Sequence, residues 1–496
     1  MLGDSSGVPM RPTLRASLLA LLPTLLVGQT PVPAAAPAAA APKPSQYPVG
    51  VPGQLMKAIA EQGQQVANLQ ELVDTIGPRL TGSERMRRAH GWAQAKLTQM
   101  GAQNVHEEAW DFGFAWTRGL DQARLLTHNQ MPLMIAHNAF TPGFDKPVVG
   151  EVMEPADFKL ATLQALKGQL KGRILLRTMG ARPAPGAPRP AGMPNPQEQD
   201  TLNQFLKEEG VLAVLTMSNK QYGLLTTGGR TFKEIGKAPV PAATLTQEGF
   251  KQLQRLLARK EPVKLELSLG GKLSKTPVKD YNVVGEIRGS EKPEEVVIIG
   301  AHMDSWDLST GANDNGTGTC ASIEALRAIL ASGAKPKRTI RVVLFSGEEQ
   351  GLLGSKAYAK AHKDELDKVQ AVIVDDMGTG RIRGWALQGR EDVKAAMAGV
   401  ISPMNDFGLR EVSLARMGST DHASFLPYGV PAFSAQQDAE DYFSHTHHSH
   451  VDSFERVQPE ALLQGTQALA VTAWELANLE QRLPHKAPEA PREPAR

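Results

Sequence analysis

The second half of the chain alternates short β-branched apolar runs with helical patterns, and this alternation constrains the fold more than any other feature. Helical patterns at 317–330 and 352–362 separate the runs. Buried strands alternating with helices predict a mostly parallel sheet with helices on both faces, hence an α/β fold. In such sheets, functional groups gather beyond the carboxyl ends of the strands. The apolar runs are 296–299, 339–345, 369–374 and 430–433.

The rest of the chain divides by composition and pattern. Residues 54–103 favour helix, interrupted by a turn at 77–84 (GPRLTGSE), and strand-like runs follow as far as 269. A Pro/Gly-rich stretch at 181–196 predicts a mobile, exposed loop. The predicted order is a signal peptide at 1–29, an Ala/Pro-rich linker at 30–50, the first part of the catalytic domain at 51–135, an inserted small α/β domain at 136–275, the rest of the catalytic domain at 276–483 and a loose tail at 484–496.

The N-terminal segment predicts export. Arg11 and Arg15 precede an apolar run at 16–27, which is shorter than the roughly 20 residues that span a bilayer. Small residues suited to cleavage follow. A leader without a targeting role is the alternative, and Met10 is a second possible start. We expect a soluble mature protein in a periplasm or outside the cell.

Charge and cysteine content narrow the possible partners and metal ligands. Lys and Arg number 54 against 52 for Asp and Glu, a balance that favours neither nucleic acid nor an anionic membrane as a partner. Cys320 is the only cysteine, so intrachain disulfides and Cys-rich zinc sites are excluded. Any metal must therefore be held by histidines and carboxylates.

Two polar motifs follow the first apolar run. AHMDSWD places His302 at a predicted strand end, with Asp304 positioned to accept the second N–H of its ring. GANDNGTG then places Asp314 among residues that permit tight turns just before a helix. Taken singly, the first motif is better explained by a surface turn and the second by a cap of the helix that follows.

Two acidic pairs follow the next two runs. SGEEQGLLGS carries Glu348 and Glu349, of which one can bind metal while the other acts as a general base. VIVDDMGTG carries Asp375 and Asp376, for which an Asx-turn is the alternative.

A histidine-rich tract, HTHHSHVDS, follows the last apolar run. It contains four histidines, and with His422 it gives five of the twelve histidines of the chain between residues 422 and 450. That concentration favours metal binding over a solvated loop. The histidines of the tract are His445, His447, His448 and His450.

The motifs together place histidines and carboxylates at successive strand ends of one predicted sheet. Such a ligand set without cysteine suits two zinc ions that share a carboxylate. Two zinc ions about 3.5–4 Å apart can bind a bridging hydroxide and polarise a carbonyl oxygen, so hydrolysis of an amide bond is the expected chemistry.

In this order, the motifs resemble those of the co-catalytic zinc exopeptidases, which include bacterial leucyl aminopeptidases and glutamate carboxypeptidases, and most closely the plasma glutamate carboxypeptidase type. The resemblance runs from about Gly53 to Leu479. It implies a zinc aminopeptidase-like α/β domain with a protease-associated domain inserted before the first ligand.

The resemblance also implies a role for each motif residue. Glu348 would act as general base, Asp304 would orient His302, and Asp421, His422 and His447 would lie in the substrate pocket. In related chains a tyrosine can stand where His447 does. The implied metal ligands are His302 and Asp376 for one zinc, Glu349 and His448 for the other, and Asp314 between them.

Several functions remain open on the sequence alone. The resemblance favours dipeptides or short peptides as substrates and a homodimer as the assembly. An aminopeptidase that releases N-terminal residues is the main alternative. The aminoacylase and dipeptidase group fits less well because the inserted domain comes early and the gap between His302 and Asp314 is short. A single-zinc cyclase acting on N-terminal glutamine and a non-catalytic receptor-like ectodomain fit less well because the ligand set is complete.

Overall fold

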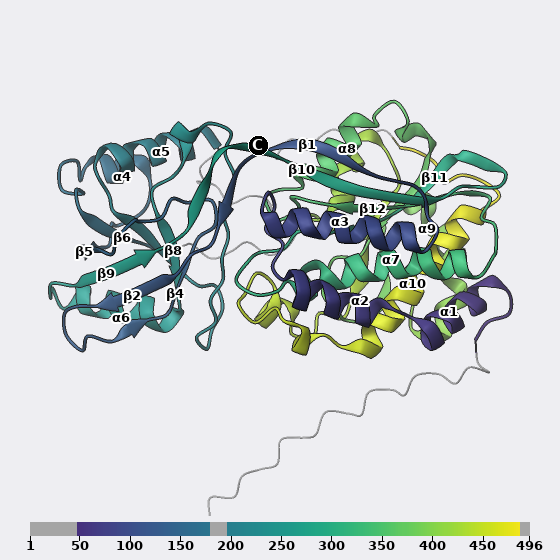
Figure 1. Cartoon of the computed structure of the whole chain (residues 1–496), viewed down its shortest axis with the longest axis horizontal. Helices are drawn as coiled ribbons and strands as arrows, with labels where there is room; N and C mark the ends of the chain where they lie inside the picture. Colours follow the sequence, from purple (N-terminus) through teal and green to yellow (C-terminus); the bar gives the residue numbers. More distant parts are fainter. Residues whose placement is uncertain (1–46, 179–195, 487–496) are drawn as a thin grey trace, which may run out of the picture. The chain divides into compact units, whose positions relative to one another are not determined.

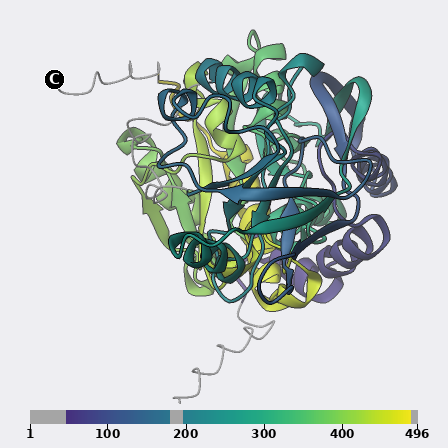
Figure 2. The ribbon, with the colours of Figure 1, turned by 90° about the vertical axis from the view of Figure 1, so that its left-hand side faces the viewer.

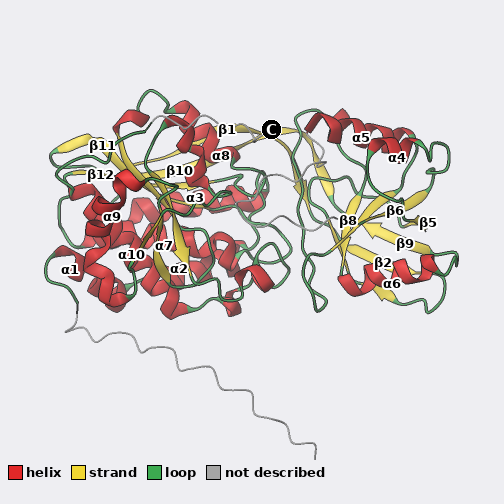
Figure 3. Cartoon of the chain, turned by 180° about the vertical axis from the view of Figure 1, so that it is seen from behind, coloured by secondary structure: helices red, strands yellow, loops and turns green. Residues whose placement is uncertain are grey.

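The computed structural model describes residues 47–178 and 196–486. The predicted signal peptide, most of the linker, nearly all of the 181–196 loop and most of the tail lie outside these residues. The described chain forms two eight-stranded sheets with helices packed against them (Figures 1 and 3), so the predicted mixed α/β class is confirmed.

Four parallel strands lie at the centre of the first sheet. They are β12 (Arg338–Phe345), β11 (Lys292–His302), β13 (Val369–Val374) and β16 (Ala432–Gln437), in that spatial order. The first three contain the predicted apolar runs 339–345, 296–299 and 369–374, whereas β16 begins two residues into the predicted run 430–433 and continues to Gln437. The outer strands are β1 (Gln103–Thr117) and β10 (Lys272–Ile287) on one side and β14 (Ile382–Ala386) and β15 (Glu411–Ser413) on the other.

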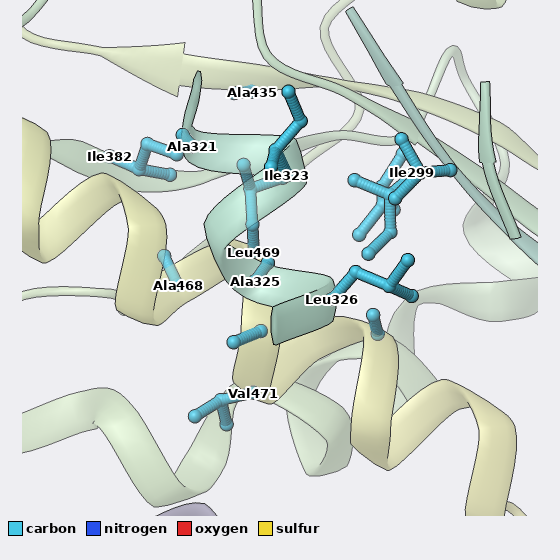
Figure 4. Close-up of a cluster of buried hydrophobic side chains, with 14 of the residues drawn as sticks. Ile299, Ala321, Ile323, Ala325, Leu326, Ile382, Ala435, Ala468, Leu469 and Val471 are labelled. Carbon is cyan, nitrogen blue, oxygen red and sulfur yellow. The ribbon is translucent and has the colours of Figure 1, made fainter. Parts of the chain in front are cut away.

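The two faces of this sheet are buried by different helices, because side chains along a strand alternate between faces. Val297 and Ile299 of β11 join the larger core, whereas Val296 and Ile298 join a smaller core on the opposite face. Figure 4 shows Ile299 near Leu326 and other apolar side chains of the larger core. That core is built on α1 (Val51–Gln62), α2 (Gln65–Glu71), α3 (Glu84–Gln99), α7 (Thr317–Ala331), α9 (Lys394–Ile401) and α10 (Pro459–Asn478).

The smaller core contains side chains of α8 (Leu353–Ala361). Helices therefore cover both faces of the sheet, as predicted, although far more helical surface packs on one face than on the other.

The second sheet is formed by residues 121–269 and has its own cores on its two faces. Leu175 of β6 packs with α4 and α5, whereas Ile174 packs with α6. Figure 2 turns the molecule so that this sheet and its helices face the viewer. Its helices are α4 (Leu160–Gln164), α5 (Pro196–Glu208) and α6 (Gln247–Ala258), and its strands, in spatial order, are β3 (Pro132–Leu133), β2 (Asp121–Leu125), β9 (Lys264–Leu269), β5 (Val148–Met153), β6 (Arg173–Arg177), β7 (Ala213–Met217), β8 (Ala242–Leu245) and β4 (Ile135–His137).

Two features of the strand arrangement differ from a simple reading of the sequence. Strands β2 and β3 precede residue 136 yet belong to the second sheet, because β2 pairs antiparallel with β9. Residue 275 lies inside β10, which pairs with β1 over most of its length. The domain boundaries at 136 and 275 stay a prediction. In the structure, β2 and β3 lie before the first boundary and β10 spans the second.

Candidate metal centre

The predicted site residues lie beyond the carboxyl ends of the central parallel strands. His302 is the last residue of β11 and is paired in register with Phe345, the last residue of β12. The chain leaves β12 through Gly347, whose φ of +70° favours glycine, and Glu348 and Glu349 follow. Parallel strands bring their carboxyl ends to one edge, so residues distant in sequence meet there.

The other predicted ligands come from turns around the same edge. Asp375 and Asp376 follow β13 directly. Asp314 lies in a short π-helical turn (Ala312–Gly316) ahead of α7, and its φ of −123° and ψ of 90° depart from helical values. His448 comes just after another such turn (Tyr442–Thr446) that follows β16.

Asp314 lies between two histidines that are far apart in the sequence. Its Oδ1 is 3.4 Å from Nε2 of His302, and its Oδ2 is 3.5 Å from Nε2 of His448. One carboxylate therefore presents a different oxygen to each imidazole. The side chain of Asp314 is only 5% exposed, which removes it from competing water.

Two groups of possible metal ligands share Asp314. In the first, Nε2 of His302 also lies 3.1 Å from Oδ1 of Asp376, and the three ligand atoms lie within 4.8 Å of one another. The second group consists of Asp314, His447 and His448, within the same limit. Glu349 approaches the second group, with its Oε2 2.9 Å from Nε2 of His448.

The donor atoms at these groups suit zinc. Nitrogen and carboxylate oxygen are common zinc ligands, and Oδ2 of Asp314 and Oε1 of Glu349 are buried without a hydrogen-bond partner. Burial and neighbouring carboxylates, Asp314 first among them, raise the pKa of Glu349 well above its usual value. A buried excess of carboxylates with unsatisfied oxygens is what a divalent cation would neutralise.

At the first group, the nearby carboxylates outweigh the effect of burial on the pKa of His302. Burial alone would lower the pKa of His302, but the nearby Asp376 and hydrogen bonds to Asp304 and Asp314 raise it well above its usual value. The Nδ1 atom of His302 is 3.0 Å from the backbone oxygen of Asp304 and 3.6 Å from its carboxylate. Because Nδ1 is engaged on that side, Nε2 is the ring nitrogen turned toward Asp314 and Asp376.

The Asp304 carboxylate connects three segments around the centre. It accepts a hydrogen bond of 2.9 Å from the hydroxyl of Thr81 and longer ones, 3.3 and 3.4 Å, from the backbone N–H groups of Glu348 and Glu349. Asp304 is fully buried. It therefore holds the glutamate turn against the strand end that carries His302.

The structure separates the two members of each acidic pair. Asp376 faces His302, whereas Asp375 is buried with an unpartnered Oδ1 and, within the described residues, belongs to neither ligand group. Burial and the charge of Asp376 raise the pKa of Asp375 to about 7. Neither glutamate belongs to the two groups found among the described residues, but Oε2 of Glu349 contacts Nε2 of His448. Burial raises the pKa of Glu348 well above the usual value.

The predicted pocket residues fall in two places. Asp421 and His422 lie fully buried in a 3-10 turn (Asp421–Ser424), where Nε2 of His422 is 3.0 Å from the backbone oxygen of Met417. Burial raises the pKa of Asp421 to about 7. His447 instead stacks on His448 with ring centroids 3.7 Å apart.

Several residues without an assigned role in the sequence support the ligand turns. Arg79 is fully buried and donates bonds of 2.7 Å to the backbone oxygens of Met303, Thr310 and Gly311, all of which lie between His302 and Asp314. Arg79 and Thr81 both lie in the GPRLTGSE turn. The polar residues between its glycines are the sequence feature that could have indicated a role for them.

Asp452 gives a similar support to Asp314. Its carboxylate accepts hydrogen bonds of 2.7 Å from the backbone N–H of Asn313 and 3.1 Å from that of Asp314. In the sequence, the position of Asp452 four residues after His448, within the histidine-rich tract, is the feature that could have indicated this supporting role.

Comparisons with known proteins find related peptidases. A family model described as peptidase family M28 matches residues 282–473. Carboxypeptidase Q from Bos taurus is 32% identical over 430 residues, covering 85% of this chain and 87% of the relative. A peptidase M28 precursor from Shewanella amazonensis, of known structure, is 29% identical with a TM-score of 0.75, covering 88% of this chain and 98% of the other.

A more distant structure shares the fold alone. A zinc aminopeptidase from Bacillus subtilis superposes with a TM-score of 0.61 at 18% identity, covering 84% of this chain and 95% of the other.

Proposed function

The chain belongs to peptidase family M28, and from that premise we propose that it is a two-zinc exopeptidase that hydrolyses dipeptides or short peptides. The observation that carries the proposal is the position of Asp314, which presents one carboxylate oxygen to His302 and the other to His448. A carboxylate shared in this way is suited to bridge two metal ions.

Five residues would hold the metals. His302 and Asp376 would bind one zinc, Glu349 and His448 the other, and Asp314 both. The 2.9 Å approach of Glu349 to His448 and the 3.1 Å approach of Asp376 to His302 support this division. When bound, the two ions would polarise the scissile carbonyl and lower the pKa of an attacking water.

Glu348 would act as the general base. Hydrogen bonding of its backbone N–H to Asp304 fixes the turn on which it stands, next to Glu349, whose side chain contacts His448. Its carboxylate would take a proton from the attacking water and deliver it to the nitrogen of the leaving amine. Burial raises the pKa of Glu348, which makes its carboxylate a stronger base toward the attacking water.

The substrate class rests on similarity to carboxypeptidase Q. An aminopeptidase that releases N-terminal residues is the second candidate, favoured by the fold shared with the Bacillus subtilis zinc aminopeptidase. Within the described residues, no helix is long and apolar enough to cross a bilayer. We further propose, from the N-terminal pattern, that the protein is exported.

A rate panel of dipeptides tests the substrate proposal. The dipeptides carry both ends free, a blocked N-terminus or a blocked C-terminus. A dipeptidase needs both free ends, an aminopeptidase tolerates a blocked C-terminus and a carboxypeptidase tolerates a blocked N-terminus. Hydrolysis of none of the three by the zinc-loaded protein would contradict the proposed exopeptidase.

A further inference from the structure

A segment next to the second sheet is hydrogen-bonded to the tract that carries His448. Thr226 and Ser449 form an antiparallel β-bridge. On its two sides, the N–H of Thr227 donates to the backbone oxygen of His448 and the N–H of His450 donates to that of Leu225, both at 3.2 Å. Two residues of the tract are thus held by backbone atoms about 220 positions away in the sequence.

The ring of His450 adds a side-chain bond to this bridge. Its Nδ1 accepts a hydrogen bond of 3.0 Å from the N–H of Leu225. Of the four histidines in the tract, His447 and His448 face Asp314, whereas His450 faces the segment from the second sheet. Leu225 and Thr227 are buried, with exposed fractions of 8% and 7%, so these bonds are protected from competing water.

His448 needs support of this kind because of its backbone conformation. Its φ of +60° lies in the left-handed region, which residues other than glycine seldom adopt. Such a conformation persists where the surrounding contacts fix it. The contacts within the tract include the N–H of Ser449, which donates to Thr446 at 2.9 Å, and the Leu225–Thr227 segment supplies the contacts from outside.

We infer that Leu225–Thr227 and His450 are positioning residues for the second metal, acting through the backbone of His448. The inference rests on the proposed function, since it takes His448 as a zinc ligand. The bridge holds the imidazole where Asp314 and Glu349 can share a metal with it. Residues before the first ligand in the sequence thus complete the metal centre.

Coupling of this kind is reciprocal. If the bridge stabilises the metal-binding position of His448, then zinc must stabilise the bridge by the same free energy. Removal of zinc is therefore expected to increase hydrogen exchange at the amides of Leu225, Thr227 and His450. The amides within β6, which hydrogen-bond inside the second sheet and carry none of the proposed ligands, serve as the internal reference.

Three variants of the full chain test the inference. His450→Ala removes the acceptor for the Leu225 amide, and His450→Asn restores an acceptor near the same position. His445→Ala changes a half-buried histidine of the same tract whose Nδ1 is hydrogen-bonded to Ser444 rather than to the second-sheet segment. Zinc content and affinity are measured by titration with a competing chelator, and amide exchange by mass spectrometry.

We expect His450→Ala to weaken binding of the second zinc, the one assigned to Glu349 and His448, about 10–100-fold, the usual cost of losing a residue that orients a ligand. Its 225–227 amides should exchange faster, whereas His450→Asn and His445→Ala should behave like the wild type. Equal zinc affinity and equal exchange in His450→Ala and the wild type would overturn the inference.

Thr227→Pro gives an independent variant, because it removes the N–H that donates to His448 and leaves every histidine intact. It should also weaken the second zinc selectively, and unchanged affinity would count against the inference. Failure of the proposed function is distinguishable from either outcome: in that case the wild-type chain itself would bind fewer than two zinc ions.

Discussion

The backbone N–H of Asp314 donates a 3.1 Å hydrogen bond to Oδ2 of Asp452. The same carboxylate accepts from Asn313 at 2.7 Å, so one buried side chain satisfies two backbone donors of the turn that carries the shared ligand. The histidine-rich tract therefore fixes this turn as well as contributing His448.

Replacement of Asp452 by Ala should weaken both folding and zinc binding. Each buried donor left without a partner costs about 1–3 kcal/mol, and loss of an orienting residue typically lowers metal affinity about 10–100-fold. Denaturant unfolding and zinc titration measure the two effects. The control is Asp441→Ala, which breaks an exposed ion pair with Arg456 and should cost about 1 kcal/mol or less. Equal effects of both substitutions would contradict the role of Asp452.

The adjacent residues Asp375 and Asp376 give a matched pair of variants. Asp376→Asn should lose zinc from the first group, because its Oδ1 faces His302 at 3.1 Å. Asp375→Asn should retain both ions, since Asp375 lies outside the ligand groups of the described chain and burial already favours its neutral form. Metal analysis of the two purified variants decides the point, and the reverse result would reassign the ligand.

Much of this arrangement was predictable, because it depends on local patterns. The apolar runs gave the four central strands, and the polar residues after them gave the edge at which they meet. The family inferred from the motifs is confirmed by the comparisons. The choices of Asp376 over Asp375 and of His448 over its neighbours were taken from the resemblance, since spacing alone leaves each pair open. Their roles stay predictions.

Long-range contacts were not predictable from local pattern. The C-terminal half of strand β1 alternates buried aromatic residues, from Trp110 to Trp116, with other residues, and this pattern is typical of a strand. It does not identify the partner strand β10, which lies about 170 residues away. Arg79 reads as a residue of a surface turn, yet it is fully buried against carbonyls more than 220 positions away. Only the folded chain brings such partners together.

Substitution of Glu348 by Gln should separate metal binding from catalysis. Gln has nearly the same shape but cannot accept the proton, so activity should fall by several orders of magnitude while zinc content stays at the wild-type level. Steady-state rates on a dipeptide, with metal content measured on the same sample, give both readouts. Near wild-type activity in this variant would exclude Glu348 as the general base.

The rate of the wild-type enzyme should depend on pH through the same residue. A base is active only when deprotonated, and burial raises the pKa of Glu348. kcat/KM should therefore fall, as the pH decreases, at a higher pH than an ordinary glutamate would cause. The profile is measured with excess zinc to keep the site loaded. If kcat/KM stayed unchanged down to about pH 4.3, the ordinary pKa of glutamate, a raised pKa for Glu348 would be contradicted.

The zinc content of the purified chain tests the shared position of Asp314 most directly. After saturation with zinc and removal of the excess, elemental analysis should give two zinc ions per chain. Asp314→Asn should lose both or retain one weakly, because the variant replaces one oxygen of the carboxylate that serves both groups. A single zinc in the active wild-type enzyme, or two tightly bound zinc ions in Asp314→Asn, would contradict a metal pair bridged by Asp314.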